Sequence, residues 1–368
     1  MINQDRLERL KQEMKAQNID GIALVPGPNM EYMSHIHSHL SERPIVLFLP
    51  VNDDPTIVIP NLEAMKAEAV GIPSERIHDW RDDEGYMTAF MTAANQLKLS
   101  NFRLGVEALH MRVLELDILQ KVAPGLKTVH AESVMSALRL VKDAEEIAAM
   151  ERAIAVAQEA MEKLLPSIKI GQTEKEIAAR LTQLLMDGGA DSIAFGPIVS
   201  AGPNAASPHA TPTERPLQAG DLLVIDWGCY VDGYPSDITR TFAVGDIDDE
   251  AKRIYNAVKI ANEQGKLASG PTSSGQDVDR ASREVIEEAG YGEYFIHRTG
   301  HGLGLEVHEP PFMMEGNETI MDPGNVITVE PGIYLPGKNG VRIEDDVVIT
   351  KDGYRSMTTF PRELITVG

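Results

Sequence analysis

The chain has little cysteine, an excess of acid over base, and no long apolar segment. Its single cysteine, Cys229, cannot form an internal disulfide, which favours a reducing compartment and predicts a cytoplasmic protein. No apolar run reaches the roughly 18 residues that a membrane helix needs, and the charged first residues predict no secretory signal. With 34 Lys and Arg against 56 Asp and Glu, the net charge of −22 argues against binding to nucleic acid or to anionic membranes.

The length of 368 residues predicts two domains. Residues 1–130 alternate short helical patterns with short apolar runs, such as 21–25 and 56–59, which are bounded by Gly, Pro and Asn. This alternation predicts a small α/β domain. Residues 134–368 contain longer amphipathic helices and hairpins, and they form the predicted second domain.

The second domain contains one short pattern twice. The first copy reads Gly220-Asp-Leu-Leu-Val-Ile-Asp226-Trp-Gly-Cys-Tyr230, and the second reads Gly324-Asn-Val-Ile-Thr-Val-Glu330-Pro-Gly-Ile-Tyr334. Each copy is followed by a turn and a strand-like run with a further acid, which is Asp237 in the first and Glu344 in the second. Matched glycines, acids and tyrosines at one offset favour an internal duplication over two unrelated hairpins.

Two helical patterns precede each copy. Those before the first copy begin at Asp143 and Thr173, each with a Glu three residues later, which is the spacing of a capping box. Those before the second copy cover about 249–267 and 277–289. The repeated order of helix, helix and hairpin predicts a pseudo-twofold α+β domain, in which two helix pairs cover a curved antiparallel sheet.

The acids of the two copies lie in apolar, strand-like runs: Asp226, Asp237, Glu330 and Glu344. A buried carboxylate without a partner is strongly destabilising, so these groups need cations, which Arg240, Arg342 or divalent metal ions could supply. His301, in a Gly-His-Gly segment, adds an imidazole to a set of hard ligands that suits two Mn²⁺, Co²⁺ or Zn²⁺ ions. The alternative interpretation places each acid on the solvent face of its hairpin.

Two further histidines, His209 and His308, lie outside any helical pattern. Each could hydrogen-bond the carbonyl group of a substrate, or the oxyanion that forms from it. The alternative is that both are surface histidines without a role in chemistry.

These motifs resemble the pita-bread metallopeptidases, in particular their aminopeptidase P and prolidase branch. The matching segments are Leu138–Ile147, Asp226–Phe242, Gly300–Glu309, Thr328–Gly332 and Val341–Asp345. The resemblance implies a C-terminal pita-bread domain, preceded by a smaller α/β domain of the creatinase type that serves dimerisation and substrate access.

The resemblance also implies a dinuclear metal centre, with manganese as the first expectation and cobalt or zinc as alternatives. Its five ligands would be Asp226, Asp237, His301, Glu330 and Glu344. Asp226 and Asp237 would bind one ion, His301 and Glu330 the other, and Asp237 and Glu344 would bridge the two. A hydroxide between the ions would be the nucleophile.

Further roles follow from the same resemblance. Glu330 would be the general base, His308 would bind the substrate carbonyl, and His209 would contact the residue after the scissile bond. Arg342 would orient a carboxylate of the site and complete the substrate-binding set with the two histidines. The expected activity is hydrolysis of Xaa-Pro bonds, as an Xaa-Pro dipeptidase or aminopeptidase, by a homodimer.

Two segments affect the choice of substrate. Residues 29–39 resemble a family loop that leans toward the active site of the partner subunit. Its His35, His37 and His39 predict a solvated loop, or contacts with the end of a substrate across a dimer, rather than a metal site. Several prolidases have an arginine four residues after the second histidine, to pair with the carboxylate of a dipeptide, whereas this chain has Phe312 there. Longer peptides could then be substrates, unless an arginine elsewhere or a histidine of the partner's loop binds the carboxylate. The alternatives are a non-proline aminopeptidase, a hydrolase of another small amide, and a catalytically inactive binding protein.

Overall fold

The computed structural model describes residues 2–368, which divide into two compact units, Met1–Arg139 and Leu140–Gly368. The division falls a few residues after the point at which the sequence pattern changes, because helix α6 (Glu132–Arg139) packs against helix α1 (Gln4–Ala16) of the first unit. No helix among residues 2–368 is long and apolar enough to span a membrane.

The first unit is a mixed six-stranded sheet with the order β4-β3-β2-β1-β5-β6. Its strands are β1 (Gly21–Leu24), β2 (Val46–Pro50), β3 (Thr56–Pro60), β4 (Ile77–Trp80), β5 (Arg103–Val106) and β6 (Lys127–His130). The other helices of the unit are α2 (Pro28–Ser34), α3 (Ala64–Ala69), α4 (Met87–Leu97) and α5 (Val113–Val122). The predicted α/β character of this unit is therefore confirmed.

Residues 29–39 are only partly the predicted loop. Helix α2 covers the first part of the segment, because Pro28 starts the helix and Met30 and Met33 are buried one turn apart. The helix ends at His35, which adopts a left-handed conformation with φ 59°. The extended loop begins only after this residue.

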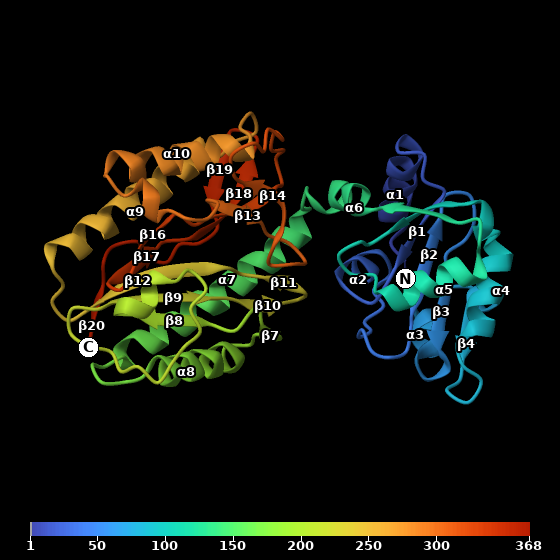
Figure 1. Ribbon diagram of the computed structural model, residues 1–368, viewed down its shortest axis with the longest axis horizontal. Helices are drawn as coiled ribbons and strands as arrows, with labels where there is room; N and C mark the ends of the chain where they lie inside the picture. The colour runs from blue at the N-terminus through green and yellow to red at the C-terminus, as the bar shows by residue number, and fades with distance from the viewer. Residues whose placement is uncertain (1) are drawn as a thin grey trace. The chain divides into compact units, whose positions relative to one another are not determined.

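The second unit contains two helix pairs, as predicted. The first pair is α7 (Ala144–Leu164) and α8 (Glu174–Asp187), and the second is α9 (Asp249–Ala268) and α10 (Gly275–Glu288). Both predicted capping boxes are present: Asp143 accepts hydrogen bonds from backbone N–H groups of α7 while Glu146 accepts from Asp143, and Thr173 and Glu176 do the same for α8. In Figure 1, α9 and α10 lie on one side of the strands of this unit and α8 lies on the other.

Each helix pair covers its own sheet. The first is four-stranded, with the order β20-β12-β9-β8, and comprises β8 (Ile198–Ala201), β9 (Leu222–Trp227), β12 (Ile238–Val244) and β20 (Thr366–Val367). The second is five-stranded, with the order β14-β13-β15-β18-β19, and comprises β13 (Gly300–Gly302), β14 (Glu309–Met313), β15 (Val326–Val329), β18 (Asp345–Thr350) and β19 (Gly353–Ser356). Small sheets hold β7 (Ser192–Ile193), β10 (Cys229–Val231) and β11 (Tyr234–Pro235), and β16 (Gly332–Leu335) with β17 (Asn339–Arg342).

The duplication extends beyond the strands that suggested it. The cap of α8 forms an isolated antiparallel bridge, Thr173 to Pro216, and the cap of α10 forms the corresponding bridge, Ser274 to Ile320. The hairpin of β9 and β12 in the first half corresponds to that of β15 and β18 in the second, and both are antiparallel. The predicted pseudo-twofold arrangement is therefore the architecture of this unit.

The two halves are joined at the strand that carries Thr239 and Thr241. The backbone N–H of Glu344 donates to the carbonyl of Thr239 at 3.0 Å, and the Thr241 hydroxyl donates to the carbonyl of Arg342 at 2.9 Å. These bonds join β12 of the first half to residues 342–344 of the second. Acidic side chains from both halves therefore meet along this seam.

Removing the cap of α7 provides a test of how the second unit is stabilised. In Asp143→Ala, the backbone N–H groups of Glu145 and Glu146 lose their side-chain acceptor, so we expect the free energy of unfolding to fall by about 1 kcal/mol. Urea unfolding followed by circular dichroism measures the change. Glu162→Ala, at an exposed position of the same helix, is the matched control, and equal effects of the two substitutions would contradict the capping role.

Candidate metal centre

The second unit contains a cavity of about 740 Å³. All eight residues predicted from the sequence for the site line it: His209, Asp226, Asp237, His301, His308, Glu330, Arg342 and Glu344. The volume falls within the range of small-molecule sites in proteins. The cavity also has an apolar part, formed by residues such as Phe195 and Ile198, so a ligand there would contact both polar and apolar surfaces.

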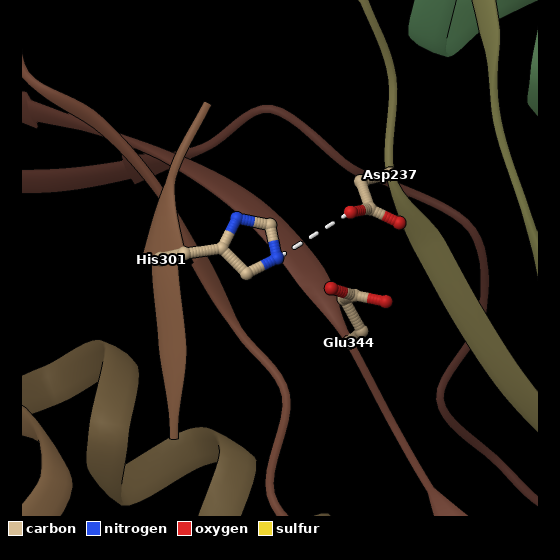
Figure 2. A group of neighbouring side chains, drawn as sticks. All are labelled: Asp237, His301 and Glu344. Atoms are coloured by element: carbon tan, nitrogen blue, oxygen red, sulfur yellow. Dashed lines mark ion pairs between the residues drawn. The ribbon is translucent and has the colours of Figure 1, made fainter. Parts of the chain in front are cut away.

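The acids and His301 converge at the inner part of this cavity. Asp237, His301 and Glu344 each offer one ligand atom, and these atoms lie within 4.8 Å of one another (Figure 2). His301 Nε2 lies 3.6 Å from Asp237 Oδ2 and 3.4 Å from Glu330 Oε1. Figure 2 shows the imidazole of His301 facing the two carboxylates from a different strand.

Three of the four acids are buried and Glu330 is partly buried, but most of them do not lie within regular strands. Asp226 is part of β9, whereas Asp237 directly precedes β12, Glu330 follows β15, and Glu344 lies between β17 and β18. Strand alternation therefore does not determine the direction of the last three side chains. Asp226 is 8% exposed, Asp237 4% and Glu344 1%, so the alternative of a solvent-facing hairpin does not hold.

The glycines beside His301 are required by the neighbouring strands. A Cβ atom at Gly300 would overlap the carbonyl oxygen of Thr328 in β15, and one at Gly302 would overlap the carbonyl oxygen of Pro310 in β14. The structure assigns them to close packing of β13 between two strands, which positions the imidazole in the cavity.

Burial has opposite effects on the acids and on the histidine. It raises the pKa of Asp226 and of Asp237, where neighbouring acids add to the effect, and it raises the pKa of Glu330 to about 8. For Glu344, burial and then the charges of Glu330 and Asp226 raise the pKa well above its ordinary value. Burial lowers the pKa of His301 to about 3, so its imidazole is neutral at pH 7, the form that binds metal ions.

Arg342 balances the negative charge of one of these acids, Asp226. Its guanidinium donates to Asp226 Oδ2 at 2.6 Å, to the Thr239 hydroxyl at 3.1 Å, to the Tyr334 hydroxyl at 3.0 Å and to the carbonyl of Pro208 at 3.1 Å. The other oxygen of Asp226, Oδ1, is buried and has no hydrogen-bond partner among residues 2–368. One arginine therefore leaves most of the negative charge of the cavity without compensation.

Arg240 does not pair with the carboxylates of these acids, although the sequence analysis names it as a possible source of positive charge for them. Its guanidinium pairs with Asp345 at 2.7 Å, and Lys266 pairs with the other oxygen of the same carboxylate at 2.7 Å. Burial alone would raise the pKa of Asp345, but the charges of Arg240 and Lys266 lower it below its ordinary value. Arg240 also donates to the backbone carbonyl of Glu344, so this buried ion cluster supports the backbone of a cavity acid and leaves its carboxylate unpaired with Arg240.

The two predicted substrate histidines line the outer part of the cavity. The ring of His308 lies 4.3 Å from that of His301, measured between centroids, and the residue is exposed. His209 is also exposed, and it follows Pro208, whose carbonyl accepts a hydrogen bond from Arg342. Both imidazoles can therefore contact a ligand that reaches the buried acids.

Comparison with known families agrees with this geometry. The model of Metallopeptidase family M24 matches residues 148–351, more than half of the chain, and that of the Creatinase/Prolidase N-terminal domain matches residues 6–141. The chain belongs to metallopeptidase family M24. This M24 protein therefore combines a creatinase-type N-terminal unit with the predicted pita-bread domain.

Individual relatives match over nearly the full length. A probable dipeptidase, PepE, from Mycobacterium tuberculosis is 36% identical over 351 residues, which cover 94% of this chain and 92% of that protein. An Xaa-Pro dipeptidase from Pyrococcus horikoshii is 34% identical over 365 residues, which cover 99% of both chains. The crystal structure of recombinant prolidase from Thermococcus sibiricus superimposes with a TM-score of 0.95 at 34% identity, and covers 100% of both chains.

The residues of the cavity suit the divalent cations that an M24 metallopeptidase uses. Carboxylate oxygens and one neutral imidazole are ligands for such ions. Like charges buried close together raise the free energy of the folded state unless cations are present, and Asp226 Oδ1 is a buried acceptor without a hydrogen-bond donor in the described part of the chain, residues 2–368. Both features are those expected of a site built to hold divalent cations.

Sequence reasoning missed a hydrogen-bonded pair, His297 and Tyr334, of which His297 lines the cavity. His297 Nδ1 lies 2.7 Å from the carbonyl of Arg298, which only accepts, so Nδ1 carries the proton and Nε2 accepts from the Tyr334 hydroxyl at 2.8 Å. Burial lowers the pKa of His297 to about 4, so this tautomer stays neutral at pH 7. Tyr334 ends the repeated pattern and was therefore visible in the sequence, but nothing there linked it to His297.

Metal-free protein should become less stable as the pH rises from about 7 to about 9. Glu330 has its pKa raised from 4.5 to about 8, so the folded state holds a proton that the unfolded chain has already lost. The stabilising effect of the proton bound to Glu330 is fully present below pH 4.5 and is lost as the pH rises through about 8. The lowered pKa of His301 acts only below its ordinary value of 6.5, outside this window.

Urea unfolding midpoints of chelator-treated protein at both pH values measure this effect. Glu330→Gln removes the titrating group, so we expect it to weaken the pH dependence while wild-type protein keeps it. A pH dependence that is the same in both proteins would contradict the role of Glu330.

Proposed function

We propose that this M24 protein is a dinuclear-metal exopeptidase that hydrolyses Xaa-Pro bonds at the N-terminus of dipeptides or short peptides. The observation that carries the proposal is the convergence of the buried acids and neutral His301 in one cavity, with Asp226 Oδ1 unsatisfied. The Xaa-Pro dipeptidase and prolidase relatives, similar over the full chain, support the choice of bond.

We infer that the cations are two, with manganese first and cobalt or zinc as alternatives. Their proposed ligands are Asp226, Asp237, His301, Glu330 and Glu344. Bound there, divalent cations would polarise a carbonyl group and lower the pKa of water. The uncompensated charge of the cavity favours this arrangement over a single cation.

Other groups of the chain would position the substrate and accept the proton of the attacking water. Glu330, the most accessible of the ligating acids with its side chain 16% exposed, would take a proton from the attacking water. His308 would donate a hydrogen bond to the oxyanion, and His209 would contact the residue after the scissile bond. Arg342 has four hydrogen bonds within the protein, so it would act on the substrate through Asp226, which it holds in place.

The same design explains how an Xaa-Pro bond can be a substrate. Proline has no amide N–H. A peptidase that must accept a hydrogen bond from this N–H therefore cannot bind an Xaa-Pro peptide bond productively. A cavity that binds the N-terminal residue through acids and cations, and polarises the carbonyl from the other side, does not need the missing donor. The peptide bond before proline is therefore accessible to this type of site.

We propose further that the protein is a cytoplasmic homodimer in which the first unit serves dimerisation and substrate access. The single buried cysteine supports a reducing compartment. Exposed apolar side chains on the first unit, including Leu62, Met65 and Leu109, support an interface there. Light scattering tests the dimer, since a particle mass equal to the chain mass of 40.3 kDa would exclude it, and cell fractionation tests the location.

Replacing a bridging acid should abolish metal binding and activity together. In Glu344→Gln or Asp237→Asn, the cavity keeps its shape but loses one negative ligand, so we expect at least a 1,000-fold fall in kcat/KM, consistent with the loss of transition-state charge stabilisation. Metal content is measured by mass spectrometry after gel filtration. Asp352→Asn, at an exposed turn, should change neither quantity, and retained metal and turnover in the cavity variants would refute the assignment.

A substrate panel decides between the proposed activity and its alternatives. With Mn²⁺ present, we expect faster cleavage of Ala-Pro than of Ala-Ala, because the apolar part of the cavity can contact the pyrrolidine ring of proline over a larger area than the methyl group of alanine. Faster cleavage of Met-Ala than of Met-Pro would favour a non-proline aminopeptidase. Absence of bound metal after addition of Mn²⁺, Co²⁺ or Zn²⁺ would favour an inactive binding protein.

A further inference from the structure

Arg298 is a half-buried cation that lines the cavity without an ionic partner. Among residues 2–368, its guanidinium makes no hydrogen bond or ion pair within the protein, and its one resolved contact is with the ring of Phe312. The other arginine of the cavity wall, Arg342, is committed to four acceptors. Arg298 is therefore the arginine of the cavity that is free to bind a ligand.

The backbone that carries Arg298 is held firmly from both sides. Arg283 of α10 donates to the carbonyls of Phe295 and His297, each at 2.9 Å. On the other side of Arg298, the N–H and hydroxyl of Thr299 both donate to Asp279 Oδ1, at 3.1 and 2.8 Å. These bonds fix the position of the Arg298 backbone relative to the cavity before a ligand binds.

Phe312 holds the guanidinium in position without using its donors. The Arg298 Cζ atom lies 4.4 Å from the centre of the Phe312 ring. Contact with a ring face leaves the N–H groups at the guanidinium edge free for a planar acceptor such as a carboxylate. The carbonyl of Phe312 accepts from the Asn317 side chain at 2.6 Å, so the ring is carried by an anchored backbone as well.

The charge of Arg298 reaches the edge of the reacting centre. It acts on Glu330, His301 and His308, and all three line the same cavity as Arg298. The four acids of the proposed metal site balance the charge of two divalent cations, so those cations leave little excess positive charge for a carboxylate that enters with the substrate. Arg298 supplies a further cation for such a group.

We propose that Arg298 binds the free C-terminal carboxylate of an Xaa-Pro dipeptide and so selects dipeptides over longer peptides. This rests on the proposed Xaa-Pro hydrolysis. The pyrrolidine ring restricts φ of proline, so the proline carboxylate has a nearly constant position relative to the scissile carbonyl. A rigidly held arginine suits such a group better than it suits the variable side chain of Xaa.

The proposal also accounts for Phe312 at the position where several prolidases have an arginine. The cation is not lost in this chain. It is supplied by Arg298, and Phe312 serves as the surface on which the guanidinium rests. A strict preference for dipeptides is therefore compatible with the apolar residue at position 312.

The experiment compares wild-type enzyme with Arg298→Met, which keeps an unbranched apolar side chain against Phe312, and with Arg298→Lys. Arg280→Met, which removes an exposed arginine paired with Glu315, is the matched control. Substrates are Ala-Pro, Ala-Pro amide, Glu-Pro amide and Ala-Pro-Ala in the presence of Mn²⁺. Ala-Pro amide preserves the scissile bond and removes only the negative charge.

We expect Arg298→Met to lose about 10- to 100-fold in kcat/KM on Ala-Pro, mainly through KM, the range for one charged hydrogen-bonded pair. On Ala-Pro amide it should equal wild-type enzyme, and Arg298→Lys should recover part of the loss on Ala-Pro. Equal losses on both substrates would assign Arg298 a purely structural role and overturn the proposal. A loss of kcat/KM confined to Glu-Pro amide, with Ala-Pro unaffected, would also overturn the proposal, because Arg298 would then bind the side chain of Xaa.

A binding measurement separates this proposal from the proposed activity. Calorimetric titration with proline and with prolinamide needs no turnover. Tighter binding of proline in wild-type protein, lost in Arg298→Met and kept in Arg280→Met, supports the role of Arg298 even if no Xaa-Pro bond is cleaved. Equal affinities for proline and prolinamide in wild-type protein overturn it even if Ala-Pro is a good substrate.

Discussion

Repulsion among buried carboxylates is the constraint on which the rest of the second unit depends. Asp226, Asp237, Glu330 and Glu344 lie together where the two halves of the unit meet. Such a cluster raises the free energy of the folded chain unless protons or cations compensate it. The helix caps, the hydrogen bonds along the seam and the buried cluster around Asp345 stabilise the scaffold that holds these acids in place.

Features that follow local rules could be predicted from the sequence. The capping boxes of α7 and α8, the helix pairs and the repeated hairpin have short-range signatures, and the acids were visible because they interrupt apolar runs. Their residue roles as ligands came from the resemblance and are proposals here. The reason for the glycines beside His301 could not be predicted, because it depends on the carbonyls of Thr328 and Pro310 in neighbouring strands.

The features that sequence reasoning missed depend on tertiary contacts. Helix α2 is short and begins with Pro28 in a segment that resembled a loop, and burial of its methionines decides its conformation. Arg298 drew no attention because an isolated arginine has no distinguishing spacing, and the contact with Phe312 appears only when β13 and β14 pair. His297 and Tyr334 are joined by a hydrogen bond between distant parts of the chain.

The duplicated halves contribute unequally to the proposed metal site. The first half supplies Asp226 and Asp237, and the second supplies His301, Glu330 and Glu344. Neither half alone can hold the proposed pair of ions. During synthesis on the ribosome, a nascent polypeptide would therefore lack part of this site until both halves had emerged and folded together.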